Sequence, residues 1–421
     1  MVENSDLIIV GAGIVGLSSA YYIKKNNPDI TIKVIDRAST FAQGNTGKSA
    51  AGFRNLFTSD INFKLSDSTT KFYRHVQEEM GIDLGMKFVG YLFLFGKNMP
   101  FWVDVMLERK IAVLKNPDDV FEDGILSKMP QRESADLMSL QDVENTLYGP
   151  ECGIIEPDLV SSFYYDECRK MGVEFQFSTE VKKVNMAPVQ PLNFPGEPFI
   201  WQDKKIESLT TDRGDLTAER YIFATDVWTT GLLDPIGIDS HIRPKKRQVF
   251  QISGESIQRI LFSCKLNDEH IIPFTILPKS GVYLRPAVKE RSLWVGVADD
   301  LGRDFSFTED PQAEEDFYNY NLRTIAESYF LGFKNSSMTA KWAGYYSYNT
   351  LDKTPWVFRF MNAVVATGTS GSGILKGDAI GRIVDAYFSG REKVQLYGGS
   401  EIPSSALDIK RERVEDEHVI L

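Results

Sequence analysis

The chain has 421 residues, 43% of them hydrophobic and 25% charged, and a formal net charge of −11 at pH 7. These proportions are ordinary for a soluble globular protein with room for two sizeable cores. The negative balance argues against a general affinity for nucleic acid or for anionic membranes.

The few cysteines and histidines bear on whether the protein has disulfides or a metal site. Three cysteines at unrelated spacings and four scattered histidines favour neither a disulfide framework nor a metal site. No apolar run approaches membrane-spanning length, and the first core strand begins by Leu7, with no signal peptide before it. We therefore expect a cytoplasmic protein with reduced thiols and no bound metal.

Residues 7–36 carry the first motif. An apolar run of strand length, residues 7–10, leads directly into the turn GAGIVG and then into a helix-length amphipathic stretch. A second, β-branched strand over residues 31–35 ends at Asp36. This order of strand, G-x-G-x-x-G turn, helix, strand and acid is typical of a unit that binds a dinucleotide.

Each part of this unit has a physical role. Gly11 permits the tight turn, Gly13 lets the backbone approach a pyrophosphate, and Gly16 lets the helix pack closely on the strand. The helix N-terminus offers free N–H groups and a partial positive charge to phosphates, and Asp36 is placed to accept hydrogen bonds from a ribose. The predicted contacts from this unit are Gly11, Ala12, Gly13, Ile14, Val15, Gly16, Asp36 and Arg37.

A loop of small and polar residues follows over residues 38–52. Long loops beside a dinucleotide site are usually functional. The segment TGKSAAGFR, residues 46–54, has the composition to wrap the phosphates and the ring edge of a cofactor. Its predicted contacts are Thr46, Gly47, Lys48, Ser49, Ala50 and Ala51.

The middle of the chain carries helices and strands without another phosphate-binding turn. Helices are expected over residues 63–80, 102–114, 159–171 and 311–330, and residues 126–140 contain acid-rich turn and helix signals. Strands are expected over residues 87–95, 173–177, 181–186, 220–226, 249–252, 282–285 and 293–297. The proline-rich residues 187–198 predict a surface hairpin tip or a small insertion, and the charged tail after Gly399 is expected to be loosely held.

A second glycine-rich turn, GTSGSG at residues 368–373, lies between a strand over residues 362–367 and a helix that runs to Phe388. A flavin develops negative charge at N1 and O2 on reduction, and a helix N-terminus aimed there stabilises the reduced form. The pair of turns therefore favours FAD in an extended form. The predicted contacts are Gly368, Gly371, Ser372, Gly373, Ile374, Leu375 and Lys376.

Several pieces together carry a resemblance to a known family. They are VGAGIVGLSSAYYI, TGKSAAGFR, GIIEPDLVSSFYYDECRKMGVEF, ERYIFATDVW, GVYLRP, WAGYYSYNTLDKTPWV and ATGTSGSGILKGDAIGRIV. The chain resembles the D-amino-acid oxidase superfamily over roughly residues 5–390. The most similar members are glycine oxidase, sarcosine oxidase, dimethylglycine dehydrogenase and the amino-acid dehydrogenase β-subunits.

The resemblance implies an α/β fold, in which a Rossmann-like FAD-binding domain is interleaved with an α+β substrate domain built on a mostly antiparallel sheet. The implied FAD-binding domain comprises residues 1–86, 150–235 and 340–390, the substrate domain residues 87–149 and 236–339, and a C-terminal tail residues 391–421. Further implied cofactor contacts are Val181, Ala224, Thr225, Trp228 and Gly344.

Two departures from the family pattern bear on the flavin. Members with covalently bound FAD use a cysteine just before the T-P-D segment or a histidine in the loop at residues 44–54. This chain has Tyr345 and no histidine at these places, so we expect non-covalent FAD. The oxygen-activating lysine of monomeric sarcosine oxidases is replaced by Trp294, which favours a dehydrogenase, although other oxidases of the group also lack that lysine.

Two further departures bear on the substrate. Glycine oxidase-like members carry a carboxylate-binding arginine where this chain has Tyr345 and Tyr346. The family lysine after the C-terminal glycines falls at Leu375, one position before Lys376. Neither family role therefore transfers directly to this chain.

Five side chains are the candidates for substrate binding and catalysis. Arg54 and Arg285 are the best carboxylate anchors, because a guanidinium binds a carboxylate through two parallel hydrogen bonds; a structural ion pair is the alternative for each. Lys48 is placed to reach either the N5 side of the flavin or a phosphate. Tyr346 and Tyr348 have hydroxyls for a carboxylate, with simple packing as the alternative.

We therefore expect an FAD-dependent amino-acid dehydrogenase or oxidase that oxidises the C–N bond of a small amino acid or N-methyl amino acid. The alternatives are a 2-hydroxy-acid dehydrogenase of the same fold and a flavin-bearing subunit or assembly factor with structural FAD. Asp226, where the family usually has glycine, gives the last alternative some weight. The electron acceptor (oxygen, a quinone or a partner subunit), the identity of the amino acid and the oligomeric state remain open at this point.

Overall fold

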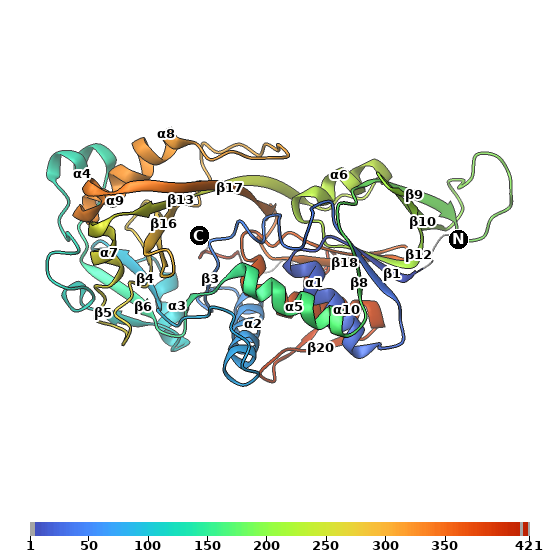
Figure 1. Cartoon of the computed structure of the whole chain (residues 1–421), viewed down its shortest axis with the longest axis horizontal. Helices are drawn as coiled ribbons and strands as arrows, with labels where there is room; N and C mark the ends of the chain where they lie inside the picture. The colour runs from blue at the N-terminus through green and yellow to red at the C-terminus, as the bar shows by residue number, and fades with distance from the viewer. Residues whose placement is uncertain (1–4, 413–415, 420–421) are drawn as a thin grey trace.

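The computed structural model describes residues 5–412 and 416–419, and its layers are shown in Figure 1. A six-stranded sheet forms one half, in the order β18-β19-β12-β1-β2-β8. Its strands are parallel except for β18, which runs antiparallel to β19. Their bounds are β1 Ser5–Val10, β2 Ile32–Ile35, β8 Glu174–Gln176, β12 Ala218–Phe223, β18 Trp356–Phe360 and β19 Ala363–Thr367.

Both faces of this sheet are buried, and each faces a different core. Successive side chains of a strand point to opposite faces and so enter different cores. Leu7 and Ile9 of β1 join the core formed with the helices, and Ile8 and Val10 join a second core formed with a three-stranded meander. The helices are α1 Ile14–Asn26, α2 Asp60–Glu78, α5 Pro157–Lys170 and α10 Gly373–Ser389. The meander consists of β9 Val181–Pro188, β10 Lys204–Thr211 and β11 Gly214–Leu216.

The other half is an eight-stranded sheet in the order β17-β13-β16-β15-β14-β4-β6-β5. All its neighbours are antiparallel except β14 and β4. The bounds are β4 Tyr91–Phe95, β5 Val113–Lys115, β6 Asn145–Gly149, β13 Ile242–Ser253, β14 Phe274–Ile276, β15 Tyr283–Ala287, β16 Ser292–Gly296 and β17 Ser337–Asn349. The expected α/β class, with a parallel sheet and a mostly antiparallel one, is confirmed.

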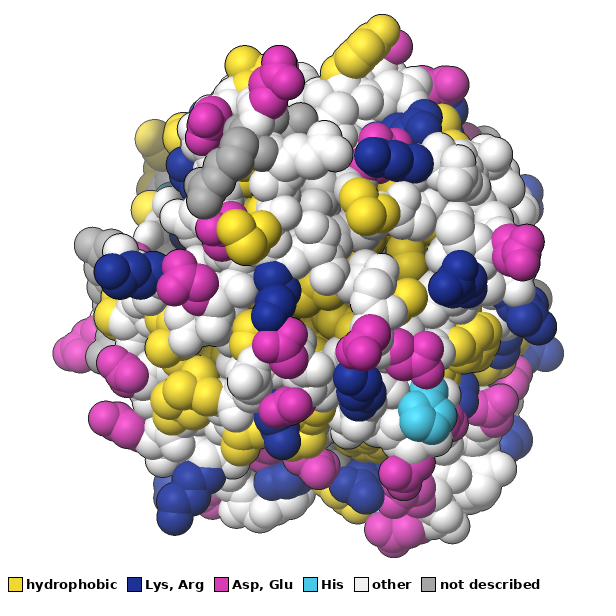
Figure 2. Space-filling view, turned by 90° about the vertical axis from the view of Figure 1, so that its left-hand side faces the viewer, with side chains coloured by type: hydrophobic (Ala, Val, Ile, Leu, Met, Phe, Trp, Pro, Cys, Tyr) yellow, Lys and Arg dark blue, Asp and Glu magenta, His cyan; other side chains and the backbone are white. Residues whose placement is uncertain are grey.

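Smaller elements complete the fold. The remaining helices are α3 Trp102–Glu108, α4 Arg132–Met138, α6 Thr229–Leu233, α7 Glu255–Leu261, α8 Glu315–Phe317 and α9 Arg323–Tyr329. Two short ladders join β3 Gly52–Phe53 to β7 Gly153–Ile154 and β20 Lys393–Gln395 to β21 Glu401–Pro403. Within the described residues, no helix is both long enough and apolar enough to cross a bilayer. Basic and acidic side chains intermingle over the face shown in Figure 2.

Two helix predictions need correction. The helix expected over residues 102–114 ends at Glu108, and residues 113–115 form the edge strand β5 instead. The helix expected over residues 311–330 begins only at Glu315 and contains a π-helical turn at Tyr318–Leu322. The proline-rich loop lies at the tip of the β9–β10 hairpin, as predicted.

The described part of the tail after Gly399, residues 400–412 and 416–419, packs on the rest of the protein and is not loosely held; residues 413–415 and 420–421 lie outside the described residues. Ile402 and Leu407 are buried against the helical core, because apolar residues recur among its charges. Arg411 donates to both carboxylate oxygens of Asp352 at 2.8 Å.

Candidate active site

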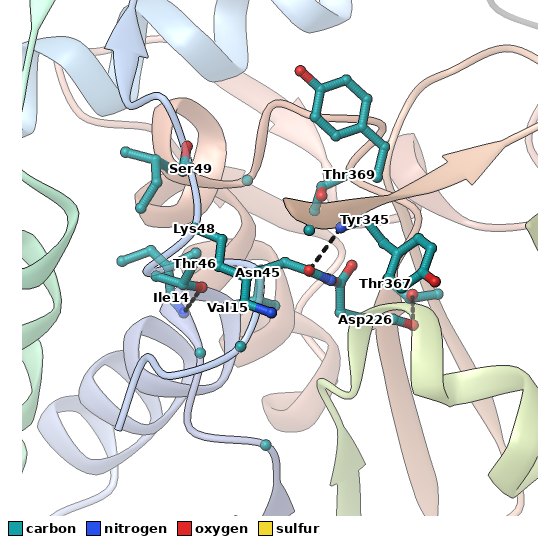
Figure 3. Close-up of a pocket in the computed structure, with 18 of the residues that line it drawn as sticks. Ile14, Val15, Asn45, Thr46, Lys48, Ser49, Asp226, Tyr345, Thr367 and Thr369 are labelled. Carbon is teal, nitrogen blue, oxygen red and sulfur yellow. Dashed lines mark hydrogen bonds between the residues drawn. The ribbon is translucent and has the colours of Figure 1, made fainter. Parts of the chain in front are cut away.

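A cavity of about 490 Å³ is lined from both sheets. Its walls come from segments far apart in the sequence: the first glycine turn, residues 42–54, the turn after β12, strands β13 and β17, and the second glycine turn. Figure 3 shows side chains from α1, residues 45–49, the turn after β12, β17 and the end of β19 with the second glycine turn around one space. The fold therefore brings the two glycine turns to the same cavity.

The first glycine turn forms one end of the cavity. Gly11 has a φ of +104°, and a Cβ there would lie 2.4 Å from the carbonyl oxygen of Ala224. A Cβ at Gly16 would lie 1.9 Å from the carbonyl oxygen of Gly11, so only glycine fits at either position. Gly13 borders the cavity, and only the Thr46 hydroxyl, at 3.1 Å, lies near its missing Cβ.

Side chains of neighbouring segments hold this turn in place. The Asp36 carboxylate accepts hydrogen bonds from the amides of Ala12 at 2.7 Å and Ala38 at 2.8 Å. Thr46 accepts from the amide of Ile14 at 3.1 Å, a bond drawn in Figure 3. The other amides in the first turn of α1 have no intrahelical partner by geometry and suit an anionic ligand.

The second glycine turn lies beside the first. Gly371 has a φ of +85°, and a Cβ there would lie 2.3 Å from the ring of Tyr346. A Cβ at Gly377 would lie 2.6 Å from Cγ1 of Ile14, so the N-terminal turns of α10 and α1 are in close contact. Two helix N-termini thus open onto one cavity.

Asp226 joins three segments of the cavity wall. Its φ of +48° lies in the left-handed region, which explains why glycine suits this position. Its carboxylate accepts a hydrogen bond from the Asn45 amide at 2.6 Å, and its carbonyl oxygen accepts from the Thr367 hydroxyl at 3.0 Å. Asn45 in turn accepts from the amide of Tyr345 in β17 at 2.8 Å, as Figure 3 shows. Burial raises the pKa of Asp226.

The loop of residues 297–314 between β16 and α8, here called the strap, reaches the cavity wall through Glu309, beside Arg37. Arg37 lies over the Trp228 ring, 4.3 Å from its centroid, and pairs with Glu309. The Trp228 indole N–H donates to the same carboxylate at 3.2 Å. Phe307, two residues away, packs against both Trp228 and Tyr345.

These features fit a dinucleotide. Two adjoining helix N-termini supply amide donors for phosphates, and Gly13 leaves the backbone open at the point of closest approach. Asp36 and Arg37 both line the cavity beside the strap, where a ribose and its base are expected. The residues present therefore suit an extended FAD.

The opposite end of the cavity has a different lining. Aromatic and charged side chains from distant segments meet there, namely Arg54, Phe57, Tyr91, Arg247, Phe274, Tyr283, Tyr346, Lys376 and Glu417. Burial raises the pKa of Tyr91 and of Tyr283, so both hydroxyls stay protonated. This end combines an apolar wall with donors for an anionic group.

Arg247 projects from β13 into this end. Its guanidinium donates to the Asp300 carboxylate at 2.7 Å and to the carbonyl oxygens of Lys246 at 3.2 Å and Asp299 at 3.3 Å. It also lies over the Tyr346 ring, 4.7 Å from its centroid. Its Nε is buried without a partner among the described residues. An unpaired buried donor costs free energy, so this group favours an acceptor in the cavity.

Arg54 is 5% exposed and lies over the Phe57 ring. Its guanidinium donates to the carbonyl oxygens of Leu56 and, at 2.6 Å, of Val419. Burial lowers the pKa of this guanidinium, and the Tyr91 hydroxyl and the nearby Glu417 carboxylate oppose that shift.

Lys376 is buried at the fourth position of α10. Its ammonium donates to the Asn62 side chain at 2.7 Å and lies over the Phe57 ring. Burial lowers its pKa to about 7, an effect that Glu417 opposes and Arg54 reinforces. Near neutral pH the Lys376 side chain is therefore present in both its protonated and its neutral form.

Most of the predicted cofactor contacts line the cavity. They are Gly11, Gly13, Ile14, Val15, Asp36, Arg37, Thr46, Lys48, Ser49, Ala50, Ala51, Val181, Ala224, Thr225, Trp228, Gly344, Gly371, Ser372, Gly373, Ile374, Leu375 and Lys376. Ala12, Gly16, Gly47 and Gly368 lie behind this surface and shape the turns.

Of the five substrate candidates, Arg54, Lys48 and Tyr346 line the cavity, whereas Arg285 and Tyr348 do not. Arg285 is fully buried, and its donors bond to the carbonyl oxygens of Ala50 and Ile155, to Pro286, and to the Glu156 carboxylate.

These partners use four of the five N–H donors of Arg285, so it links residues 50, 155 and 156 to β15 and does not reach the cavity. Tyr348 directs its hydroxyl to Asp300 at 3.3 Å. Neither residue lines the cavity, and both side chains bond to other parts of the protein.

Arg247, Asn45 and Glu417 are among the residues of the site that did not emerge from the sequence. The basic run RPKKR, residues 243–247, in a strand-like context was a usable signal for Arg247. Asn45 and Glu417 carry no such signal, because an asparagine in a loop and a glutamate in a charged tail are ordinary.

Comparison with known proteins identifies the family. Residues 6–386 match the sequence profile described as FAD dependent oxidoreductase (DAO). The chain is 24% identical over 432 residues to the Xenopus laevis FAD-dependent oxidoreductase domain-containing protein 1, covering 91% of this chain and 78% of that one. It is 22% identical to the glycine oxidase of Bacillus subtilis (strain 168), covering 93% and 95% of the two chains.

Solved structures share the fold. L-proline dehydrogenase from P. horikoshii superimposes with a TM-score of 0.71 at 20% identity, covering 97% of each chain. L-amino acid deaminase from Proteus vulgaris gives a TM-score of 0.72 at 13% identity, covering 98% of each chain. With the sequence profile spanning most of its length, this chain belongs to the DAO family of FAD-dependent oxidoreductases.

Proposed function

We propose that this protein is an amino-acid dehydrogenase or oxidase that removes a hydride from the carbon next to nitrogen in a small primary or N-methyl amino acid. The observation that carries the proposal is a pair of buried guanidinium groups, Arg54 and Arg247, at the aromatic end of the cavity. FAD, when bound, supplies the hydride acceptor at N5. Such a reaction depends mainly on holding the substrate in the right geometry.

The residues of this end have distinct roles in the proposal. Arg247 binds the substrate carboxylate, because its unpaired Nε lies in the buried wall. Arg54 adds a second positive charge, and the rings of Tyr91, Tyr283 and Tyr346 enclose the substrate and exclude water. Exclusion of water strengthens the pairing between the carboxylate and the arginines.

Relatives support an amine substrate. Glycine oxidase, L-proline dehydrogenase and L-amino acid deaminase are each named for a reaction of an amino acid. We further propose that FAD is held without a covalent bond, because neither cysteine nor histidine is among the described residues that line the cavity.

An anaerobic titration tests the proposal. The purified protein is mixed in turn with sarcosine, proline, glycine, D-alanine and 2-hydroxyglutarate while the visible band of oxidised flavin is recorded. We expect bleaching by one or more amino acids, and the rate of recovery in air then separates an oxidase from a dehydrogenase.

The other outcomes are decisive as well. Bleaching by 2-hydroxyglutarate alone would reassign the protein as a hydroxy-acid dehydrogenase. A flavin that no amino or hydroxy acid reduces, in a chain that needs a partner for stability, would support a structural cofactor. Denaturation in acid should release free FAD into the supernatant, and flavin that stays with the precipitate would contradict non-covalent binding.

A further inference from the structure

The C-terminal segment of residues 416–419 returns to the aromatic end of the cavity. It lies beyond residues 6–386, the part of the chain that matches the family profile. Glu417 is 2% exposed and forms part of the cavity wall. The segment therefore contributes directly to the proposed substrate site.

The Glu417 carboxylate fastens this segment to the N-terminus of α2. It accepts hydrogen bonds from the amide and hydroxyl of Thr58, both at 2.9 Å, and from those of Ser59 at 3.2 and 3.0 Å. It also accepts from the amide of Val419 at 3.0 Å and from the Asn62 side chain at 3.5 Å. Both carboxylate oxygens are thus fully used inside the protein, and Glu417 is an anchor and not a ligand for substrate.

Burial alone would raise the pKa of Glu417, but the hydrogen bonds from Thr58 and Val419 outweigh burial and hold it below its ordinary value. The anchor therefore stays ionised at neutral pH. A helix N-terminus suits this charge, because its free amides and dipole favour an anion.

Arg54 depends on this anchored segment. Its guanidinium has five N–H donors, and one of its terminal nitrogens donates to the Val419 carbonyl oxygen at 2.6 Å. The other terminal nitrogen donates to the carbonyl oxygen of Leu56. These two acceptors fix the plane of the guanidinium over Phe57 and so fix the direction of its remaining donors.

The segment also contacts the other half of the molecule. The ring of His418 packs edge-to-face on Phe101, just before α3, with 4.8 Å between the ring centroids. The Arg109 guanidinium donates to the carbonyl oxygens of Phe57 at 2.6 Å and Thr58 at 2.9 Å, next to the anchor. The segment thus closes the aromatic end of the cavity between the two halves.

We propose that residues 416–419 are a positioning segment of the substrate site: Glu417 anchors the segment on α2, and the Val419 carbonyl orients the Arg54 guanidinium toward the substrate carboxylate. The inference rests on the proposed function, in which Arg54 contributes to carboxylate binding. It assigns a role to a part of the chain outside the family profile.

The experiment compares acetate with acetamide as probes on the FAD-loaded protein, by following the change in the flavin spectrum. Glu417→Ala removes the anchor, and we expect the Kd for acetate to rise about tenfold to a hundredfold, the effect of losing an oriented charged donor. The Kd for acetamide and the flavin content should stay within about twofold of the wild type, since only the anionic probe uses the arginine charge. For any amino acid that the enzyme oxidises, KM should rise while kcat changes little.

Glu401→Ala is the matched control, because it removes an exposed carboxylate from the same tail, one whose ion pair within the described part of the chain is with Lys393 at 2.7 Å. It should leave both probes unaffected. If Glu417→Ala does not accumulate as a folded flavoprotein, Glu417→Gln carries the same test, because it keeps the side-chain volume and one carbonyl acceptor.

Arg54→Ala separates this inference from the proposed function. If Arg54→Ala weakens acetate binding and the Glu417 variants do not, the segment has no positioning role and the proposed function stands. If Arg54→Ala itself leaves acetate binding unchanged, the carboxylate role of Arg54 is wrong. Equal weakening of acetate and acetamide by the Glu417 variants would indicate a general collapse of the cavity and would also overturn the inference.

Discussion

The two ends of the cavity are built in different ways. The dinucleotide end is made of backbone and small side chains, and the glycines of each of its two turns lie within six residues of one another. The aromatic end is made of bulky and charged side chains contributed by β4, β13, β15, β17, α10 and residues 416–419. Binding of the shared cofactor thus depends on local backbone geometry, whereas selection of the substrate depends on how distant segments meet.

The largest effect of a substitution is expected on FAD retention at Gly11, where the backbone leaves no room for a side chain. Gly11→Ala places a Cβ 2.4 Å from the carbonyl oxygen of Ala224 on a residue with a φ of +104°. We expect a protein that no longer retains FAD, measured as loss of the flavin band relative to the protein absorbance after gel filtration. Gly214→Ala is the control, because Gly214 also has a positive φ, +110°, but lies outside the cavity, and no described atom lies within 4 Å of its added Cβ. A yellow Gly11→Ala protein would show that the turn can be rebuilt.

At the aromatic end, a change of side-chain shape should lower activity and leave the cofactor bound. Arg247→Lys keeps the charge but loses the planar fork, so kcat/KM for the amino-acid substrate should fall about tenfold to a hundredfold. The same substitution at Arg243, which is exposed on the same strand and outside the cavity, should have no such effect. Equal loss of activity in both variants would argue against a specific role for Arg247.

Lys376 lies where the two ends meet, and it should give a pH dependence of stability. Its pKa is about 7 in the folded protein and close to 10.5 when unfolded, so between these values the unfolded chain binds more protons. The free energy of unfolding should therefore rise with pH across this window, by about 1.4 kcal/mol per pH unit.

Lys376→Met should remove this slope, as measured by urea unfolding at several pH values from 7 to 10. Lys205→Met, at an exposed position of β10, should preserve it. Identical pH profiles for wild type and Lys376→Met would show that the buried amine is not neutralised on folding.

The smallest effect is expected at the strap. Arg37 and Glu309 have side chains that are 37% and 65% exposed, and such pairs are worth about 0–1 kcal/mol. Glu309→Gln should therefore speed the release of FAD by no more than about fivefold, followed as the recovery of flavin fluorescence on dilution. The effect should shrink in high salt, and an effect that is insensitive to salt would mean that the carboxylate acts through shape and not through charge.

The same contrast explains what the sequence could predict. The dinucleotide unit was predictable because its glycines, strand and acid lie close together in the sequence and each answers a local steric demand. Lys48, Arg54 and Tyr346 were placed near the site because they sit in or beside recognisable motifs. These predictions needed no knowledge of long-range packing.

The rest required the tertiary structure. Arg285 resembled a carboxylate anchor in its strand, but carbonyl groups from residues 50 and 155 surround it only after folding. Glu417 lies 358 positions after Ser59 and 359 after Thr58 in the sequence, and no local sequence pattern predicts such a contact. The sequence of the tail suggested a solvated segment, because charged residues outnumber the few apolar residues that pack on the core.

The ribbon of β13 and β17 has a mechanical consequence. The two strands pair continuously from Ile242 with Asn349 to Ser253 with Ser337, apart from one irregularity. At one end this ribbon belongs to the eight-stranded sheet, and at the other Ser347 accepts a hydrogen bond from the Ser370 amide of the second glycine turn at 3.0 Å. A hinge motion between the two halves would have to bend this pair of strands or break its hydrogen bonds. We therefore expect ligands to enter the cavity through small movements of loops and side chains, while the two sheets keep their relative position.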